Sequence, residues 1–283
     1  MGAHIEETTF HGQPVLALQS ADGARALVSL FGAQVLAWQP ARGDEALYLS
    51  EEALFDGRSP IRGGIPVCFP QFSDRGRLPR HGFARTEPWA LRETRGKERY
   101  AMAVFGLCEN DQTLALWPHA FEAELTLALE GQRLDVEFEV TNTGHAPFAF
   151  TAALHTYLRV REVEHVRVEG LSGLMYQEHG DRHRTTHRDG ADALVVDGPL
   201  DRLYTGVTRP LLLQEPHRNL SIETEGFPDA AIWNPWEESS AALPDLPAGG
   251  FRRFLCIEAA AARQRIELEA GQSWWGRQTL IAL

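Results

Sequence analysis

The segment FEAELTLALEGQRLDVEFEVTN, residues 121–142, decides the fold class, because each half of it changes character at every second residue. In residues 121–129, Phe, Ala and Leu alternate with Glu, Thr and Ala. In residues 134–141, Leu, Val and Phe alternate with Asp, Glu and Thr. A period of two is typical of a β-strand that buries one face and exposes the other to water. The Glu-Gly-Gln-Arg sequence between the halves suits a turn, so the segment predicts an antiparallel hairpin.

Further strands are predicted on both sides of this hairpin, and no long segment has a helical period with capping residues. The 25 Gly and 16 Pro indicate many turns, and no repeat or hinge-like linker interrupts the chain. One all-β domain over residues 1–283, a large antiparallel β-sandwich, is therefore expected, with polar residues 177–192 as an excursion within it. The other predicted strands are residues 26–30, 34–39, 100–107, 148–158, 165–169, 219–224, 230–233, 254–257 and 274–283.

The charge balance bears on the class of partner. The chain has 39 Asp and Glu against 27 Lys and Arg, a net charge of −12. Nucleic acids bind proteins through broad basic surfaces, so a nucleic-acid partner is not expected for this acidic chain. A small basic island in such a chain suits a small anionic ligand instead.

The cysteines and the N-terminus bear on location. Cys68, Cys108 and Cys256 show no paired spacing, so we expect small buried residues in a reducing compartment. The first ten residues have neither the basic start nor the apolar run of a signal peptide. The uncharged stretch 26–41 is too short to span a membrane. We expect a cytoplasmic protein with no membrane partner, and a monomer, since a sandwich of this kind needs no partner for its core.

Positive charge is concentrated in IRGGIPVCFPQFSDRGRLPRHGFAR, residues 61–85, which contains five arginines, no lysine and a single acid, Asp74. The planar guanidinium pairs with two phosphate oxygens at once, which the compact lysine ammonium does less well. The segment therefore predicts a phosphate pocket that includes Arg62 and Arg85. Arg75 and Arg77 are more simply explained as surface charge, and we leave them out of the predicted site.

Common catalytic and metal motifs are missing: there is no nucleophile elbow, no phosphate-binding loop and no dinucleotide fingerprint. His179, His183 and His187 are spaced by four, but their polar setting predicts a solvated loop rather than a metal site. A nucleophilic Cys68 or Cys256 stays an alternative. Both lie in apolar strands, where burial would raise the thiol pKa and keep them inert.

Two titratable residues interrupt apolar strands. His155 lies within FAFTAALHTYLRV, residues 148–160, and Glu258 lies within FRRFLCIEAA, residues 251–260. Taken singly, each is more simply a hydrogen-bonded core residue or a wet strand end. Sequence patterns alone do not assign them a role.

The ordered set RGGIPVCFPQF…LPRHGFAR, LHTYL and FLCIE resembles the aldose 1-epimerase superfamily, and most closely its hexose-6-phosphate mutarotase branch, the glucose-6-phosphate 1-epimerases. The resemblance extends through DRLY at 201–204 and DAAIWNPW at 229–236. It implies a galactose-mutarotase-like β-sandwich that interconverts the α and β anomers of glucose 6-phosphate and similar hexose 6-phosphates. It implies no metal and no cofactor.

The resemblance also implies roles for two acid–base residues. His155 matches the acid that gives a proton to the sugar ring oxygen, and Glu258 matches the base that takes the anomeric hydroxyl proton. An imidazole and a carboxylate on opposite sides of the ring can carry out both transfers and exchange roles on reclosure. Burial beneath aromatic residues such as Trp233 or Phe83 would raise the Glu258 pKa, while arginines would lower it, and the sequence leaves this balance open.

The remaining implied residues bind the substrate. Arg62 and Arg85 match the arginines that hold the phosphate and orient the sugar. Asp201 matches a carboxylate that binds sugar hydroxyls, and His81 resembles the second histidine of the site. Arg80 departs from the family pattern, in which a neutral polar residue such as Gln occupies this place, so its role is an extra phosphate contact or a changed preference for the phosphosugar.

Two alternatives stay open from the sequence. The first is an epimerase of unphosphorylated aldoses on the same scaffold. The second is a non-catalytic carbohydrate-binding sandwich, which would keep aromatic platforms without needing both His155 and Glu258.

Overall fold

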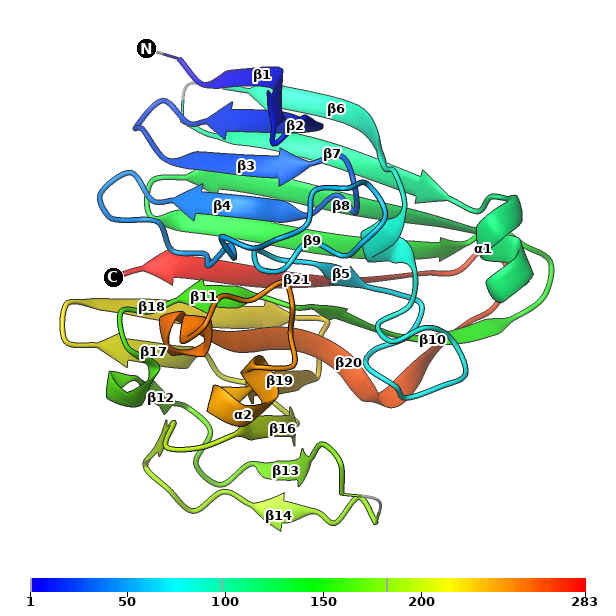
Figure 1. The fold of residues 1–283 in the computed structure, drawn as a ribbon. Coiled ribbons are helices and arrows are strands. Elements are labelled where there is room, and N and C mark those ends of the chain that lie inside the picture. Colours follow the sequence, from blue (N-terminus) through cyan, green and yellow to red (C-terminus); the bar gives the residue numbers. More distant parts are fainter. Residues whose placement is uncertain (1, 98, 182) are drawn as a thin grey trace.

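The predicted hairpin forms and lies within the largest of three antiparallel sheets (Figure 1). In this computed structural model, which describes residues 2–97, 99–181 and 183–283, it consists of β8 (Phe121–Glu130) and β9 (Arg133–Asn142). The two strands pair along their whole length, with Leu129 opposite Leu134. Their alternating apolar side chains are buried and their acidic ones face outward, as the period of two predicts.

The sheet that contains this hairpin has nine strands in the order β15-β12-β17-β18-β21-β9-β8-β7-β6. Short turns join three of the neighbouring pairs, β6–β7, β8–β9 and β17–β18, a connection that antiparallel pairing allows. The other members are β6 (Ala90–Gly96), β7 (Ala101–Cys108), β12 (Arg167–Glu169), β15 (Ala193–Val195), β17 (Leu211–Glu215), β18 (Arg218–Glu225) and β21 (Ser273–Ala282).

An eight-stranded sheet carries Asp201 and Glu258, and His155 lies between two of its strands. Seven strands follow the order β14-β13-β16-β19-β20-β10-β5, and β11 pairs with β20 beside them. The strands are β5 (Val67–Cys68), β10 (Phe148–Leu154), β11 (Tyr157–Arg159), β13 (Met175–Glu178), β14 (His187–Arg188), β16 (Leu200–Thr205), β19 (Asp229–Asn234) and β20 (Phe254–Leu268).

A third sheet, of four strands in the order β1-β2-β3-β4, lies in front of β7–β9 in Figure 1. Its buried residues Leu16 and Val28 belong to the same hydrophobic cluster as Phe105 and Leu125 of the largest sheet. The apolar faces of the two sheets are thus removed from water against each other, which is the main source of stability in a sandwich. The strands are β1 (His4–Phe10), β2 (Gln13–Gln19), β3 (Arg25–Ser29) and β4 (Val35–Gln39).

Phe69 joins the core to the segment that carries the arginines. It directly follows β5, is fully buried, and its ring centroid lies between 5.3 and 6.2 Å from those of five other aromatic rings. Most of these contacts are edge-to-face, the arrangement that aromatic quadrupoles favour. The five partners are Phe83, Trp117, Phe121, Phe138 and Phe150.

Helical structure is confined to short pieces. The helix α1 (Asp111–Leu116) begins at Asn110, whose side chain accepts hydrogen bonds from the backbone of residues 112 and 113. The helix α2 (Trp236–Ser240) and three single 3₁₀ turns, Ala84–Thr86, Val163–His165 and Gly250–Arg253, complete the set for the described residues. In that same part of the chain, no helix is both long and apolar enough to cross a membrane.

The structure confirms the all-β antiparallel sandwich and corrects several local predictions. The predicted strand 148–158 is two strands, β10 and β11, with a break at residues 155 and 156. The predicted strand 165–169 begins as a 3₁₀ turn. Cys108, expected to be buried, is exposed, whereas Cys68 and Cys256 are buried as expected.

Candidate active site

Strand register places the candidate residues on one face of the eight-stranded sheet. Asp201 of β16 lies opposite Trp233 of β19, and Trp233 lies opposite Cys256 of β20. Residues directly opposite each other share a face, as do residues two apart in one strand. Glu258, two residues beyond Cys256, therefore extends from the same face as Asp201.

His155 reaches this face because the chain breaks between β10 and β11. Its backbone N–H donates to the Pro66 carbonyl at 2.9 Å instead of continuing the ladder to β20. The next residue, Thr156, is fully buried and its hydroxyl donates to the side chain of Gln278 on β21. Gln278 in turn donates to the Ile257 carbonyl at 3.0 Å. These bonds satisfy the buried polar groups of the break and fix the position of the imidazole.

His155 and Glu258 lie side by side at the bottom of the pocket. Nδ1 of His155 is 3.4 Å from Oε1 of Glu258, and both side chains are less than a tenth exposed. Within residues 2–97, 99–181 and 183–283, neither Nδ1 of His155 nor Oε2 of Glu258 has a hydrogen-bond partner. The two groups are adjacent rather than on opposite sides of a sugar-sized gap, which corrects the arrangement expected from the sequence.

Burial moves the two pKa values in opposite directions. The pKa of Glu258 is raised well above its ordinary value by burial, with a further contribution from the Asp201 carboxylate. The pKa of His155 is lowered well below its ordinary value by burial and then by Arg85 and Arg62. Burial therefore favours the neutral form of each group. Of the two influences on Glu258 that the sequence left open, burial is the stronger.

The Tyr157 and Trp233 rings hold the His155 imidazole from two directions. The Tyr157 ring stacks on it, with centroids 4.8 Å apart and planes within 11°. Trp233 meets it edge-on at 5.8 Å. The other expected aromatic residue, Phe83, packs against Phe69 in the core instead and does not line the pocket.

His81 lies next to His155, with ring centroids 5.2 Å apart, and presents a fixed tautomer. The backbone N–H of Ser73 donates to its Nδ1 at 3.3 Å, and Sγ of Cys68 is 3.2 Å from the same atom. Since a backbone N–H is only a donor, Nδ1 is the acceptor and the proton of the neutral ring is on Nε2. Burial lowers the pKa of His81 far below its ordinary value, so the imidazole is a neutral hydrogen-bond donor through Nε2.

Glycines are required where the arginine segment passes close to other backbone. Gly64 has a φ of 62°, and a Cβ there would lie 2.0 Å from the Val35 carbonyl oxygen. Gly82 has a φ of 71°, and a Cβ there would lie 2.1 Å from the Phe69 oxygen. Only glycine fits both the conformation and the space. These two turns place Arg62 and His81 at the pocket.

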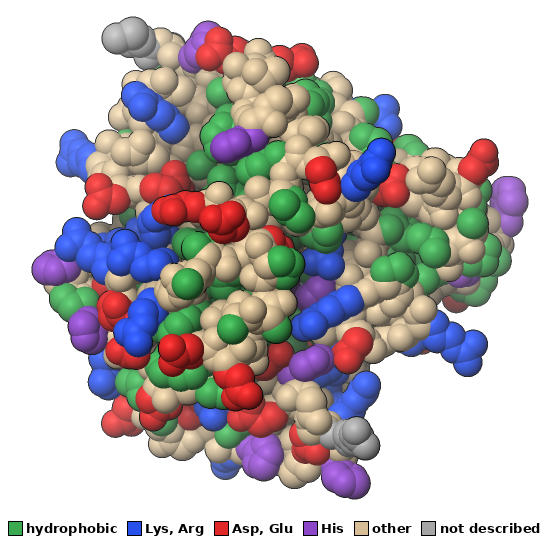
Figure 2. All heavy atoms as spheres, in the orientation of Figure 1, with side chains coloured by type: hydrophobic (Ala, Val, Ile, Leu, Met, Phe, Trp, Pro, Cys, Tyr) green, Lys and Arg blue, Asp and Glu red, His purple; other side chains and the backbone are tan. Residues whose placement is uncertain are grey.

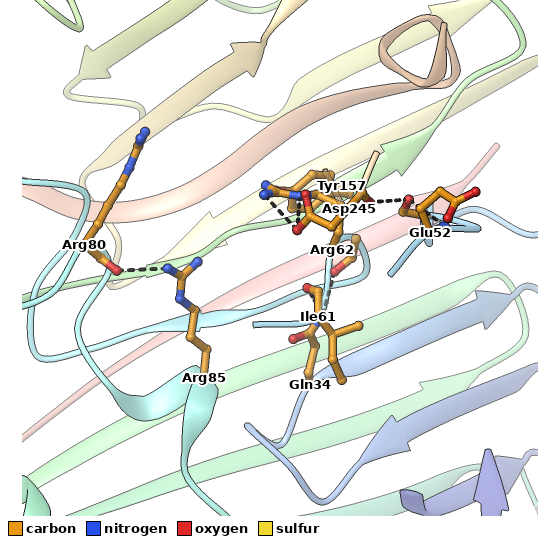
Figure 3. Close-up of polar contacts among 10 residues, drawn as sticks. Gln34, Glu52, Ile61, Arg62, Arg80, Arg85, Tyr157 and Asp245 are labelled. Carbon is orange, nitrogen blue, oxygen red and sulfur yellow. Dashed lines mark hydrogen bonds and ion pairs between the residues drawn. The ribbon is translucent and has the colours of Figure 1, made fainter. Parts of the chain in front are cut away.

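The arginines differ in how they are held (Figure 3). Arg62 is already paired: its Nε and Nη2 are each 3.1 Å from Oδ2 of Asp245, and its Nη1 donates to the Tyr157 hydroxyl at 3.0 Å. Arg85 has no such partner. Its Nη2 donates to the backbone oxygen of Arg80 at 2.9 Å, and its buried Nε has no hydrogen-bond partner among the residues that the structure describes.

Arg75 and Arg80, on the segment between β5 and the 3₁₀ turn, also line the pocket. In the described part of the chain, neither guanidinium has a carboxylate within ion-pair distance. Arg75 was left out of the predicted site, and the structure corrects this because the segment folds back over the sheet. Arg77, left out with it, is exposed and does not line the pocket.

Asp201 and His179 also line the cavity. Burial raises the pKa of Asp201 to about 6, and nearby His179 and Arg80 act in the opposite direction. His179, predicted to lie in a solvated loop, instead lines the pocket, and its Nε2 is 3.9 Å from Oδ1 of Asp74. His183 and His187 are exposed, as predicted.

Together these side chains surround one solvent-open cavity. All seven residues singled out from the sequence line it: Arg62, Arg80, His81, Arg85, His155, Asp201 and Glu258. Sequence reasoning missed Arg75 and Tyr157, whose only signal was proximity in the chain to residues already chosen, and it assigned His179 to a solvated loop. It also missed Asp245, which lies 183 residues from its partner Arg62.

The cavity floor also holds one group of possible metal ligands. His155, Cys256 and Glu258 have ligand atoms within 4.8 Å of one another. Four guanidinium groups line the same cavity, and their charge opposes the entry of a divalent cation. Burial raises the pKa of the Cys256 thiol, which further disfavours the thiolate that a metal would require.

Comparison with known proteins shows which family this chain is similar to. The family model described as aldose 1-epimerase matches residues 14–280. A protein of Cenchrus ciliaris, provisionally named glucose-6-phosphate 1-epimerase, is 33% identical over 282 residues, 96% of this chain and 85% of that protein. An Escherichia coli protein with the same provisional name is 31% identical over 250 residues, 85% of this chain and 81% of that protein.

Solved structures agree with the sequence matches. The crystal structure of a Salmonella typhimurium protein, provisionally described as a mutarotase, matches with a TM-score of 0.90 and 25% identity over 98% of this chain and 93% of that chain. A galactose mutarotase-like protein from Clostridium acetobutylicum has the same fold, with a TM-score of 0.78 and 16% identity over 100% and 99% of the two chains. The chain belongs to the aldose 1-epimerase family.

Proposed function

We propose that this protein is a hexose-6-phosphate mutarotase, which interconverts the α and β anomers of glucose 6-phosphate and similar sugars. The family implies a sugar substrate. The observation that carries the proposal is the buried, adjacent His155–Glu258 pair in a cavity that is also lined by four arginines. The provisional names of the Cenchrus and Escherichia coli relatives support the same substrate.

The pair can supply the proton donor and the proton acceptor that the reaction needs. Ring opening takes the proton from the anomeric hydroxyl O1, gives one to the ring oxygen O5, and breaks the C1–O5 bond with its electrons passing to O5. One group of the pair donates while the other accepts, which is concerted general acid–base catalysis. After rotation about C1–C2, the reverse transfers close the ring on the opposite face of the aldehyde. The original protonation state is then restored.

The short distance between the two groups is compatible with this chemistry. O1 and O5 are both bonded to C1, so the atoms that exchange protons are themselves adjacent. A donor and an acceptor only 3.4 Å apart can therefore each address one of them from the same side of the sugar. Burial favours the proton on Glu258 in the free protein. We therefore assign Glu258 as the proton donor to O5 and His155 as the proton acceptor in the first ring opening. The opposite assignment, implied by the family resemblance, operates once the proton has moved to His155.

The arginines support a phosphorylated substrate. Arg75, Arg80 and Arg85 extend from one short segment, and Arg85 has a buried Nε without a partner. A phosphate group would supply acceptor oxygens for these donors and neutralise their charge. Arg62 is held by Asp245 and Tyr157, so its first task is to position Tyr157 against His155, with phosphate contact through its remaining donor capacity.

Anomer exchange measured by NMR on glucose 6-phosphate and on glucose tests the proposal, with spontaneous mutarotation subtracted. We expect a much larger kcat/KM for glucose 6-phosphate. Arg85→Gln removes hydrogen bonds to a charged group worth about 1.5–3 kcal/mol, so kcat/KM for glucose 6-phosphate falls about 10- to 100-fold. Arg77→Gln, on the same segment but outside the cavity, is the matched control and leaves kcat/KM unchanged.

The outcomes separate the open alternatives. Equal catalysis of both sugars, unaffected by Arg85→Gln, would identify an epimerase of unphosphorylated aldoses. Binding of glucose 6-phosphate without any acceleration of exchange would identify a non-catalytic sugar-binding protein. Either result would overturn the proposal.

A further inference from the structure

A second arginine-lined hollow of about 960 Å³ lies away from the catalytic pocket. Its walls come from residues 40–46 after β4, from the end of β11, from the β17–β18 turn and from Arg253. None of its lining residues lines the catalytic cavity. Figure 2 shows Lys and Arg side chains gathered on the left side of the molecule, where Figure 1 places β17, β18 and the C-terminus.

Five arginines line this hollow, and only one of them is neutralised by a carboxylate in the described part of the chain. Arg218 is paired with Glu215 at 2.8 Å. Arg159 donates to the Leu47 carbonyl at 3.2 Å, and Arg253 donates to the Arg161 carbonyl at 2.8 Å. Backbone carbonyls orient these two guanidinium groups without cancelling their charge. The remaining two, Arg42 and Arg161, have exposed side chains.

The acidic residues of the hollow do not balance this charge. Glu215 accepts from Arg218 and from the backbone N–H of Arg161, so it is fully engaged. Oε1 of Glu45 accepts from the backbone N–H groups of Trp38 and Leu47, and burial raises the pKa of Glu45. Five arginines face three acids, the third being Asp44, in a protein whose net charge is −12.

We propose that this hollow is a second anion-binding site that takes a phosphate-bearing small molecule. Several guanidinium groups with free donors around one concavity repel one another, and a multiply charged anion relieves that repulsion. Bidentate pairing with phosphate oxygens matches the planar fork of arginine better than it matches a single carboxylate or halide. The site is distinct from the catalytic pocket and takes its ligand independently of the sugar.

Pyrophosphate is a suitable probe, and isothermal titration calorimetry on the full chain measures both its stoichiometry and its affinity. We expect two sites in the unmodified protein. The Arg42→Gln and Arg161→Gln double variant removes the second site or weakens it at least tenfold. Arg85→Gln instead weakens the catalytic pocket and leaves the second site intact.

A matched control separates the site from a general charge effect. Arg58→Gln with Arg167→Gln lowers the net charge by the same amount at exposed positions outside both pockets, and it leaves both affinities unchanged. Glucose 6-phosphate exchange in the Arg42/Arg161 double variant stays at the level of the unmodified protein, which shows that the fold and the catalytic pocket are intact. A single pyrophosphate site abolished by Arg85→Gln, or equal losses in the test and control variants, would overturn the proposal.

Discussion

Glu258 and His155 show how burial prepares two residues of different chemistry for one task. In water the carboxyl would be ionised and the imidazole would titrate near neutral pH. Inside the pocket burial favours the neutral form of each, because each charged form would lose its hydration. This preference puts a transferable proton on Glu258 and leaves a proton acceptor on His155. Neither group would be so prepared on the surface.

Removing either member of the pair should abolish anomer exchange. We expect His155→Ala and Glu258→Gln each to lower kcat by about 10²- to 10⁴-fold, the usual contribution of one positioned acid–base group. NMR exchange of glucose 6-phosphate measures the loss, and near-UV circular dichroism checks the fold. Cys256→Ala, a buried neighbour within the same cluster, keeps kcat within a few-fold. Full activity in His155→Ala or in Glu258→Gln would contradict the assignment. Loss of activity in Cys256→Ala would contradict it too.

The pKa of Asp201, about 6, predicts a pH dependence within an accessible range. Above this pH the carboxylate accepts hydrogen bonds from sugar hydroxyls, and below it the carboxyl is protonated. We expect kcat/KM for glucose 6-phosphate to decline as the pH falls through about 6. In Asp201→Asn this inflection disappears. An inflection that persists in the variant would assign it to another group.

Stability provides an independent check on Asp201. Its folded-state pKa is above the ordinary value of 3.8, so the folded state binds the proton more tightly than the unfolded state. Proton binding by Asp201 therefore stabilises the folded state at low pH. The free energy of unfolding loses this stabilisation as the pH rises from about 3.8 to about 6. Asparagine does not titrate. The stability of Asp201→Asn relative to the unmodified protein should increase across this interval in urea denaturation.

At the scale of elements, the β5 segment connects the core to the site. The Phe69 ring packs against five other aromatic rings, and the segment that follows it includes Arg75, Arg80 and His81. The same segment approaches the sheet so closely that Gly82 has no room for a side chain. Packing at Phe69 and the geometry of the arginine segment are therefore coupled.

Truncating Phe69 should be costly to the fold. Phe69→Ala leaves a cavity in a fully buried cluster and should lower the free energy of unfolding by about 3–5 kcal/mol. Phe69→Leu, which refills part of the volume, should cost clearly less. Urea denaturation followed by tryptophan fluorescence measures both. A loss below about 1 kcal/mol for Phe69→Ala would show that the cluster repacks around the gap.

Strands could be predicted from the sequence where apolar and polar residues alternate regularly along them. The hairpin 121–142 was found because every second side chain is buried. The strand β1 was missed because it is mostly exposed along its length and has no alternation. The break at residues 155 and 156 was also missed, since both flanking strands are apolar and buried on both faces. No local sequence pattern marks the residues at which the backbone leaves one strand pairing and begins the next.

For the whole molecule, charge is distributed unevenly. The chain has a net charge of −12, yet one cavity gathers four arginines and a second hollow gathers five. The sequence predicted a phosphate pocket from one arginine-rich segment. It could not predict the second hollow, whose arginines come from four separate stretches of chain. Nor could it identify Asp245 as the partner of Arg62, because that contact spans 183 residues.

This distribution predicts a salt dependence that distinguishes substrates. Raising ionic strength from about 0.01 M to about 1 M shortens the screening length from about 30 Å to about 3 Å. We expect KM for glucose 6-phosphate to rise several-fold over this range, because attraction of the phosphate dianion to the arginines is screened. The kcat should change little, and KM for glucose should stay constant. A salt-independent KM for glucose 6-phosphate would argue against recognition through charge.

The origin of the site residues in the fold has an evolutionary consequence. In the proposed mechanism, proton transfer depends on side chains fixed by the paired strands, while phosphate binding depends mainly on a single connecting segment between β5 and β6. Substitution of the arginine side chains on that segment removes charge without breaking a backbone hydrogen bond of the sheet. A descendant of this protein could therefore trade one kind of sugar for another in few steps, with the chemistry at C1 inherited unchanged.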